Sequence, residues 1–258
     1  MNEGPRWCVL IPCLNEAAAI REVVQSVLAL GAPVIVVDDG SDDATPHIVD
    51  ALPVTLVRHT ERRGKGEALR SGFREALRQG YEAVLAMDGD GQHRADDIPR
   101  IVAAAQRWPD RLVIGARLRD RDQQPRGRRF ANAFADWGIS WACAQPVADT
   151  QSGQRWYPRR ALDLVDLPAQ GFVFEAALLI TASRELGMSV VSVPIASRYR
   201  GDFRLSHFRP VRDVTRITLY TVGRVIHYGN VRASYRRSRT SPQVADSTGP
   251  GPSAARTC

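Results

Sequence analysis

The sequence predicts an α/β fold built on a mostly parallel central sheet. In the first half of the chain, short apolar runs rich in β-branched residues alternate with stretches whose apolar residues recur at helical spacing. This alternating order is typical of a parallel sheet with helices on both faces. The composition agrees, because 258 residues that are 44% hydrophobic and 24% charged suit one large domain, or one domain with a smaller lobe.

Each strand expected in the first half is a short, mostly apolar run. The runs are WCVLIP (7–12), PVIVVDD (33–39), VTLVRH (54–59), AVLAMD (83–88) and LVIGAR (112–117). Sheets of this kind bind their ligands at the carboxyl ends of the strands. Polar residues follow these ends at 12–16, 38–41, 88–92 and Arg117, so we expect them along one edge of the sheet.

The helices expected between these strands follow from caps and apolar faces. Asn15 can cap the first helix and Gly31 can end it, while Ser41 or Asp42 can cap the second. Their apolar faces recur at spacings of three and four residues. The residues of these faces are Ile20, Val23, Val24, Val27 and Leu28 in the first helix, Leu69, Phe73, Ala76 and Leu77 in the third, and Ile98, Ile101, Val102 and Ala105 in the fourth.

The second half of the chain is less regular. A basic loop (117–129) leads into an aromatic helix, and an amphipathic stretch (213–228) comes last before a tail rich in Ser, Pro, Gly and Thr. We therefore expect two halves of one domain, at 1–117 and at 118–237, the second packed on the sheet as a smaller lobe, and a disordered tail at 238–258.

Net charge, cysteine content and the length of the apolar runs limit the kind of partner and the location of the protein. The formal net charge of +7 favours anionic partners such as phosphates or anionic lipids, but the arginines are interspersed with acids and no nucleic-acid module is present, so no nucleic-acid partner is expected. The four cysteines form neither a CxxC pair nor a cluster with histidine, which indicates reduced, cytosolic thiols. No apolar run is long enough to span a membrane, so we expect a cytoplasmic protein whose membrane contact, if any, is peripheral.

The stretch MDGDGQH (87–93) places two carboxylates just past a buried strand. Asp88, Asp90 and the amide oxygen of Gln92 are hard oxygen ligands, so they predict a Mg²⁺ or Mn²⁺ site, completed by phosphates or water. Gly89 lets the backbone approach a ligand closely. Other phosphate motifs fail, since Leu69 replaces the third glycine of GxGxxG, no P-loop occurs, and Gln92 stands where a phosphatase has Thr or Val.

Four motifs in order resemble glycosyltransferase family 2, nearest to its dolichol-phosphate and polyprenyl-phosphate sugar transferases. They are IPCLNE (11–16), VVDDGSDD (36–43), RRGKGEALRSGF (62–73) and MDGDGQH (87–93). The resemblance implies a GT-A fold, which has a Rossmann-like sheet, and a nucleoside diphosphate sugar as donor. It assigns donor binding to Pro12, Asn15, Glu16, Asp38, Asp39, Lys65, Asp88, Gly89, Asp90 and Gln92, and the metal to Asp88, Asp90 and Gln92.

The second half carries the same resemblance more loosely. DTQSGQRWY (149–157) and FVFEAALL (172–179) resemble segments that line the acceptor side, which implies catalytic roles for Asp149, Arg155, Glu175 and the nearby Arg117. RYRGDFRL (198–205) resembles a loop whose cations cover the donor phosphates, so Arg198 and Arg204 join the donor site. The sequence departs from these patterns at Gln154, Ala177, Phe203 and Arg204. The resemblance implies that residues 1–117 are the nucleotide-sugar-binding half of the domain and residues 118–237 its acceptor-side half.

The resemblance implies an inverting, metal-dependent transfer from a GDP-mannose or UDP-glucose type of donor to a lipid-linked acceptor, above all polyprenyl phosphate. Such a phosphate is already anionic and needs no strong base, whereas a hydroxyl acceptor would need one, for which Asp149 is the candidate. The alternative acceptor is a hydroxyl of a specialised lipid or aryl-polyene-type metabolite, because RLSHFRPVRD (204–213) faintly resembles enzymes of those pathways. A non-catalytic nucleotide-binding protein is the third possibility.

Two stretches suggest contact with an anionic membrane. Phe130, Phe134, Trp137 and Trp141 recur at spacings of four, three and four residues, and residues 209–228 mix arginines with apolar residues. An aromatic stripe of this kind more often belongs to the protein core. Peripheral membrane contact therefore stands beside core packing as an interpretation of these residues.

Overall fold

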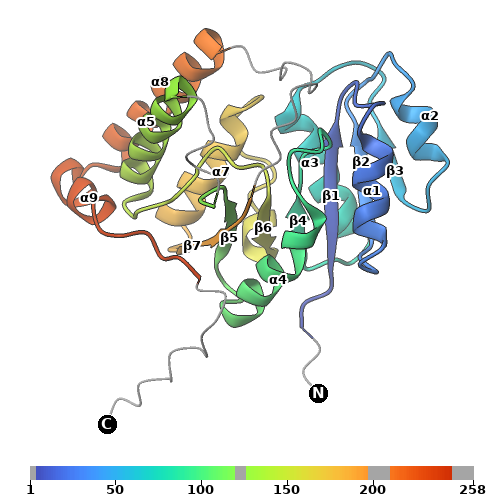
Figure 1. The fold of residues 1–258 in the computed structure, drawn as a ribbon. Coiled ribbons are helices and arrows are strands. Elements are labelled where there is room, and N and C mark those ends of the chain that lie inside the picture. Colours follow the sequence, from blue (N-terminus) through green and yellow to red (C-terminus); the bar gives the residue numbers. More distant parts are fainter. Residues whose placement is uncertain (1–3, 120–125, 197–209, 246–258) are drawn as a thin grey trace.

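A computed structural model describes residues 4–119, 126–196 and 210–245, and in this part of the chain a central seven-stranded sheet is covered by helices on both faces (Figure 1). The strand order is β3-β2-β1-β4-β6-β5-β7. Neighbouring strands are parallel except where β6 pairs with β4 and β5. The strands are β1 (Trp7–Cys13), β2 (Val34–Asp38), β3 (Thr55–Arg58), β4 (Ala83–Ala86), β5 (Leu112–Ala116), β6 (Arg155–Pro158) and β7 (Val190–Pro194).

Strand β1 lies inside the sheet and buries both of its faces. Cys8 and Leu10 belong to the hydrophobic cluster on one face, and Val9 and Ile11 to the cluster on the other. Because side chains alternate along a strand, a strand buried on both faces has a continuous apolar run. This explains why the five apolar runs of the first half predict β1 to β5 correctly.

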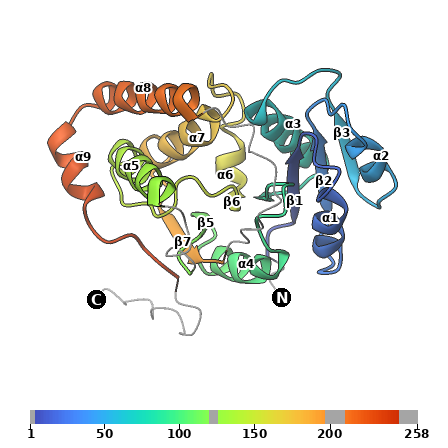
Figure 2. The ribbon, with the colours of Figure 1, turned by 45° about the horizontal axis from the view of Figure 1, so that its top comes forward.

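The helices divide between the two faces. Helices α1 (Ile20–Leu28), α2 (Thr45–Asp50) and α4 (Ile98–Arg107), the last preceded by the short η1 (Ala95–Asp97), supply buried residues to one cluster. Those that supply the other are α3 (Lys65–Arg78), α5 (Arg126–Cys143), α6 (Arg159–Leu162), α7 (Val173–Arg184) and α8 (Pro210–Tyr228). Helices α5 and α8, with α9 (Val231–Ser238), gather at the end of the molecule farthest from β3 (Figure 2).

The second half of the chain contributes strands to the same sheet, rather than only packing on it. Strand β6 inserts between β4 and β5, with Trp156 in one hydrophobic cluster and Tyr157 in the other. Sequence periodicity does not reveal so short a strand, because its two apolar residues stand between Arg155 and Pro158. Residues 239–245 also differ from the expected disordered tail, since Ser192 of β7 forms an isolated bridge with Val244.

The predicted caps of the first two helices are wrong. Helix α1 begins at Ile20, and α2 begins at Thr45, so neither Asn15 nor Ser41 stands at a cap position. Asp43 instead accepts a hydrogen bond from the Thr45 amide at 2.8 Å. The predicted end of α1 is confirmed, because Gly31 follows the helix with φ of +74° and its amide donates to the Leu28 carbonyl.

Candidate functional site

The loops after β1 and β2 are tied together at the carboxyl edge of the sheet. The Asn15 amide donates to the Ser41 hydroxyl oxygen at 2.8 Å, and the Asn15 side-chain oxygen accepts from the Asp42 amide at 3.0 Å. The Glu16 amide donates to the Thr45 hydroxyl oxygen at 2.8 Å. Pro12 lies within β1 beside Val37. The residues expected to bind the nucleoside therefore form one continuous edge, although Asn15 and Ser41 serve loop-to-loop contacts instead of helix caps.

The neighbouring residues Asp38 and Asp39 differ in how fully their carboxylate oxygens are hydrogen-bonded. Both oxygens of buried Asp39 accept hydrogen bonds, from His59 Nδ1 at 2.8 Å and from the Arg63 and Gly64 amides at 2.9 and 2.7 Å. Asp39 thus fixes the loop that leads into α3. Asp38 Oδ1 accepts from the amide and hydroxyl of Ser41. Its buried Oδ2 has no hydrogen bond within the described part of the chain, with Arg58 Nε 3.4 Å away.

The close turn after β2 requires glycine. Gly40 has φ of +78°, and a Cβ atom there would lie 2.8 Å from the Glu61 carbonyl carbon and 2.9 Å from the Arg62 amide nitrogen. Both contacts are with backbone atoms that cannot rotate away. Gly40 therefore allows the β2 edge and the loop before α3 to pack directly against each other.

Lys65, the first residue of α3, contacts the acidic turn after β4. Its ammonium nitrogen lies 2.7 Å from Asp88 Oδ1 and 3.2 Å from Glu175 Oε2 of α7. Burial opposes both charges, yet the Lys65 ammonium holds the pKa of Asp88 far below its usual range, and the two acids raise the pKa of Lys65. Lys65, Asp88 and Glu175, which lie far apart in the sequence, are thus in direct contact through the Lys65 ammonium.

Asp90 completes the acidic turn and is held by Gln92. The Gln92 amide and side-chain nitrogen donate to Asp90 Oδ1 and Oδ2 at 3.0 and 2.8 Å. Burial and the charge of Asp88 raise the pKa of Asp90. A divalent cation would relieve this repulsion, so Asp88 and Asp90 fit the predicted metal in donor chemistry. In the described residues no three His, Cys, Asp or Glu side chains are arranged to hold a metal, so other ligands would come from substrate or water.

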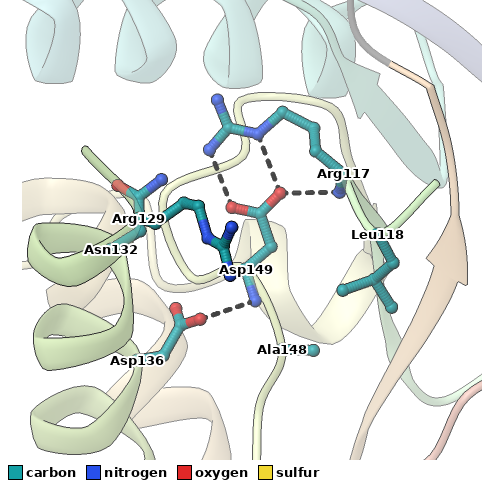
Figure 3. Close-up of a pocket in the computed structure, with 7 residues that line it drawn as sticks. All are labelled: Arg117, Leu118, Arg129, Asn132, Asp136, Ala148 and Asp149. Carbon is teal, nitrogen blue, oxygen red and sulfur yellow. Dashed lines mark hydrogen bonds and ion pairs between the residues drawn. The ribbon is translucent and has the colours of Figure 1, made fainter. Parts of the chain in front are cut away.

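Arg117, at the end of β5, holds Asp149 from three directions (Figure 3). Its Nη2 and Nε donate to the two carboxylate oxygens at 2.7 and 2.8 Å, and its amide donates to Oδ2 at 2.7 Å. Although burial opposes ionisation, these bonds hold the pKa of Asp149 below its ordinary value. The ion-pair partner of Asp149 is therefore Arg117, whereas Arg155, close by in the sequence, bonds to backbone carbonyls.

Asp136 of α5 holds the backbone of this loop. It accepts from the Asp149 amide at 3.1 Å, and from the amide and hydroxyl of Thr150 at 2.7 Å each (Figure 3). Asp149 has φ of +51°, so these bonds stabilise a backbone conformation that an aspartate rarely adopts. Nothing in the sequence around Asp136 pointed to this role. Together with Arg117, Leu118, Arg129, Asn132, Ala148 and Asp149 it lines a cavity of about 30 Å³, the room of a single water molecule.

Arg155 and Gln154 are buried beneath the site. Arg155 Nε donates to the Ser152 carbonyl at 2.7 Å and Nη2 to that of Thr150, while Nη1 has no hydrogen bond within the described residues. Gln154 Nε2 donates to the Arg94 carbonyl at 3.2 Å. Arg155 therefore holds the 149–153 loop, whereas Gln154, the residue before β6, is bonded to the segment after the acidic turn.

His93 lies next to the acidic turn, with its Nε2 3.7 Å from Asp88 Oδ2. His93 belongs to the MDGDGQH motif, but the sequence alone did not assign it a role. The arginines expected over the donor phosphates, Arg198 and Arg204, lie outside the described residues, as does most of the 204–213 stretch.

Comparison with known sequences finds a family model and several relatives that match this chain. A family model described as Glycosyl transferase family 2 matches residues 8–164. Polyprenol monophosphomannose synthase of Mycolicibacterium smegmatis is 31% identical over 206 residues, which are 74% of this chain and 76% of that protein. Undecaprenyl-phosphate mannosyltransferase of Micrococcus luteus is 32% identical over 226 residues, 78% of this chain and 88% of that protein.

Solved structures share the fold at lower identity. Glucosyl-3-phosphoglycerate synthase from Mycobacterium tuberculosis, in complex with Mn²⁺, uridine diphosphate and glucosyl-3-phosphoglycerate, is 24% identical with a TM-score of 0.62, covering 87% of this chain and 80% of that one. Mannosyl-3-phosphoglycerate synthase from Rubrobacter xylanophilus is 18% identical with a TM-score of 0.65, covering 95% and 79%.

Proposed function

The chain belongs to glycosyl transferase family 2, and we propose that it transfers a hexose from a nucleoside diphosphate sugar to polyprenyl phosphate, with inversion at the anomeric carbon. Its fold is the GT-A fold of the glycosyltransferases that it resembles. The relatives at 31% and 32% identity are a polyprenol monophosphomannose synthase and an undecaprenyl-phosphate mannosyltransferase. A donor of the GDP-mannose or UDP-glucose type follows from these names and from the uridine diphosphate of the solved complex.

The state of Asp149 is the observation that favours a phosphate acceptor. A hydroxyl acceptor needs a base to take its proton, and Asp149 was the candidate from sequence. In the structure its carboxylate accepts three hydrogen bonds from Arg117, and its pKa is lowered, which makes it a weak base. A lipid phosphate attacks as an anion and needs no such base, so this site suits a phosphate better than a hydroxyl.

On the donor side, we assign the nucleoside to the edge formed by Pro12, Asn15, Glu16, Asp38 and Asp39. Asp38 Oδ2 is a buried acceptor that receives no hydrogen bond from the described residues, although Arg58 Nε lies 3.4 Å away, and it suits an N–H or O–H donor of the base or ribose. Asp39 shapes this edge through His59 and the Gly64 amide. We place the diphosphate next to Lys65 and the acidic turn.

Asp88 and Asp90 would hold the Mg²⁺ or Mn²⁺, which supplies charge neutralisation for the nucleoside diphosphate leaving group. The ammonium group of Lys65, which lies between Asp88 and Glu175, supplies a second positive charge next to the leaving group. Gln92 keeps Asp90 oriented. An oxygen of the acceptor phosphate forms a bond to the anomeric carbon while the bond from that carbon to the diphosphate oxygen breaks, and opposite-face attack inverts the configuration.

The test compares two acceptors that differ only in the phosphate. The protein is incubated with GDP-mannose, UDP-glucose or UDP-N-acetylglucosamine and Mn²⁺ or Mg²⁺, with undecaprenyl phosphate or undecaprenol in detergent. We expect transfer from one donor to the phosphate alone, an inverted product by NMR, and loss of transfer on chelation and in Asp90→Asn. Preferential transfer to the hydroxyl would support the alternative acceptor class, and donor binding without transfer to either would support a non-catalytic role.

We also propose that the enzyme works at the cytoplasmic face of a membrane, because its acceptor is a membrane lipid. Its contact there would be peripheral. None of the helices within residues 4–119, 126–196 and 210–245 combines the length and hydrophobicity that a membrane-spanning helix needs.

A further inference from the structure

Helix α5 exposes an aromatic stripe. Phe130 is 78% exposed, and Phe134 and Trp137, four and seven residues further on, are exposed as well. Adjacent rings contact one another from Phe134 through Trp137 to Trp141, with centroids 5.7 and 5.5 Å apart. The core residues of α5 are instead Ile139, Ala142 and Cys143. The core interpretation of this stripe is therefore wrong for its first three residues.

Helix α8 carries a second apolar stripe. Leu219 and Ile226 are 68% and 69% exposed, and Val222 between them is exposed too. These residues are three and four positions apart, so they share one side of the helix. Ile217 and Thr221 are buried, and Thr221 packs near Gly138 of α5. Helix α8 thus uses one side to join the protein and presents an apolar side to the exterior.

Helix α9 continues the exposed surface. Tyr235 is exposed and its ring contacts that of Trp141 at 5.2 Å between centroids. The indole nitrogen of Trp141 donates to the Val231 carbonyl at 3.1 Å, which fixes α9 against α5. We call the exposed apolar side chains of these three helices the α5–α8–α9 face. The three helices that carry it lie at the end of the molecule opposite β3 (Figures 1 and 2).

The three helices that form this face are strongly basic. Their sequences contain nine arginines and two aspartates, with no lysine or glutamate. The exposed arginines on α8 and α9 include Arg212, Arg216, Arg232 and Arg236. Apolar and aromatic side chains bordered by arginines are typical of helices that lie in the plane of an anionic membrane surface.

We propose that the α5–α8–α9 face docks on an anionic lipid bilayer, with the apolar side chains inserted among the lipids and the arginines at the phosphate level. The charge argues against a second copy as the occupant, because a two-fold interface would bring the same arginines of both copies together. A bilayer with anionic headgroups offers the opposite charge over the whole face. The proposal thus commits to lipid and not to protein.

The α5–α8–α9 face lies close to the cavity beside Asp149, so docking would bring this cavity near the lipid surface. Arg129, Asn132 and Asp136 line the cavity beside Asp149, and they lie on a different side of α5 from the aromatic stripe. One helix, about 10–12 Å across, therefore separates the face from the cavity. Insofar as the docked enzyme receives a lipid phosphate, the inference rests on the proposed function, but docking itself requires neither donor nor acceptor.

The experiment measures binding to vesicles without any substrate. The full chain is sedimented with vesicles of phosphatidylcholine containing phosphatidylglycerol, and with phosphatidylcholine alone, at low and high salt. We expect binding to the anionic vesicles that weakens with salt. The double variant Leu219→Glu, Ile226→Glu should bind at least about tenfold more weakly, because two inserted apolar side chains are replaced by charges that the bilayer repels.

The matched control is Leu30→Glu, since Leu30 is also exposed, at 44%, but follows α1 far from the face. Its binding should equal that of the unaltered chain, and circular dichroism melting should show both variants folded. Equal binding by the double variant and the control would overturn the proposal, as would absence of binding by the unaltered chain. So would a dimer in analytical ultracentrifugation that only the double variant dissociates. Sugar transfer in detergent tests the proposed function separately, so the two can fail independently.

Discussion

Gly153 packs directly against the carboxylate of Asp88. A Cβ atom at position 153 would lie 2.1 Å from Asp88 Oδ2 and 2.6 Å from Cγ. The 149–153 loop can thus approach the acidic turn only because position 153 lacks a side chain. This contact joins the 149–153 loop to the proposed metal site.

Gly153→Ala should displace Asp88 or the loop, because neither can accommodate a methyl group at this distance. We expect loss of metal-dependent binding of the donor nucleotide and a decrease of about 1–3 kcal/mol in the free energy of unfolding. Calorimetric titration of UDP and GDP with Mn²⁺, together with urea unfolding, measures both. The control is Gly223→Ala on α8, where a Cβ atom meets nothing within 4 Å. Unchanged nucleotide binding in Gly153→Ala would contradict the prediction.

Asp149→Asn should destabilise the protein, because it leaves the largely buried Arg117 guanidinium without its anion. We expect a loss of about 3 kcal/mol in the free energy of unfolding. In the unaltered protein the lowered pKa of Asp149 means that this stabilisation is present above the unfolded pKa, about 3.9, and is lost as pH falls through the lower folded pKa.

The same residue predicts the pH profile of sugar transfer. Since Asp149 is ionised throughout the neutral range, transfer to polyprenyl phosphate should show no acid limb from this group between about pH 6 and 8. Measurement of kcat against pH decides the point. A variant Asp149→Asn that keeps its stability but loses activity, combined with an acid limb in the unaltered enzyme, would instead identify Asp149 as a base.

Lys65→Met should reduce kcat/KM by a factor of about 10² to 10³, because it removes a cation next to the developing charge of the leaving group. Lys65→Arg should not restore activity, since a planar guanidinium does not replace a compact ammonium between Asp88 and Glu175. Steady-state kinetics with the identified donor test both variants. Arg62→Met, an exposed cation in the same loop, is the control. Full activity of Lys65→Arg would show that charge alone is needed.

Asp136→Asn should weaken the 149–150 loop. An amide accepts through one oxygen, so at least one of the three hydrogen bonds to Asp149 and Thr150 is lost, at a cost of about 1–2 kcal/mol. Burial raises the pKa of Asp136, so its contribution is fully present below the unfolded pKa, about 3.9, and decreases as pH rises through the folded pKa.

The stability gap between the unaltered chain and Asp136→Asn should therefore narrow as pH rises through that window. Chemical unfolding at a series of pH values measures the gap. Asp163→Asn, at an exposed pair with Arg159, provides a comparison in which little change is expected. A gap that widens with pH would mean that the carboxylate is stabilised by its surroundings rather than opposed by burial.

The grouping of the residues proposed to bind the donor could be predicted because its signals are local. Each motif follows an apolar run that is long enough to identify a strand, and the ends of parallel strands share an edge. The contacts around Asp149 could not be predicted, because they cross long stretches of sequence. Arg117 and Asp149 are 32 residues apart, and no spacing rule relates them. Asp136 sits in a helix without a motif, so only the folded chain reveals that it holds the Asp149 amide.

The caps failed for a related reason. Asn15 and Ser41 have the chemistry of helix caps, but neither side chain caps a helix. The Ser41 hydroxyl accepts from the backbone amide of Asn15, and the Asn15 side-chain oxygen accepts from the amide of Asp42. A local rule cannot anticipate a partner supplied by a neighbouring strand end. The same applies to β6, whose identity as a strand depends on the space between β4 and β5.

Lys65 has a chemical consequence beyond its charge. The chain has 35 basic residues, and inspection of the sequence shows that every one of them except Lys65 is arginine. Its ammonium group, enclosed by Asp88 and Glu175, is therefore the sole side-chain amine of the protein. Amine-directed acylation, cross-linking or immobilisation therefore has two targets in this chain, Lys65 and the N-terminal amine. Because Asp88 and Glu175 raise the pKa of Lys65, acylation of Lys65 would report on the breaking of its ion pairs at the proposed diphosphate site.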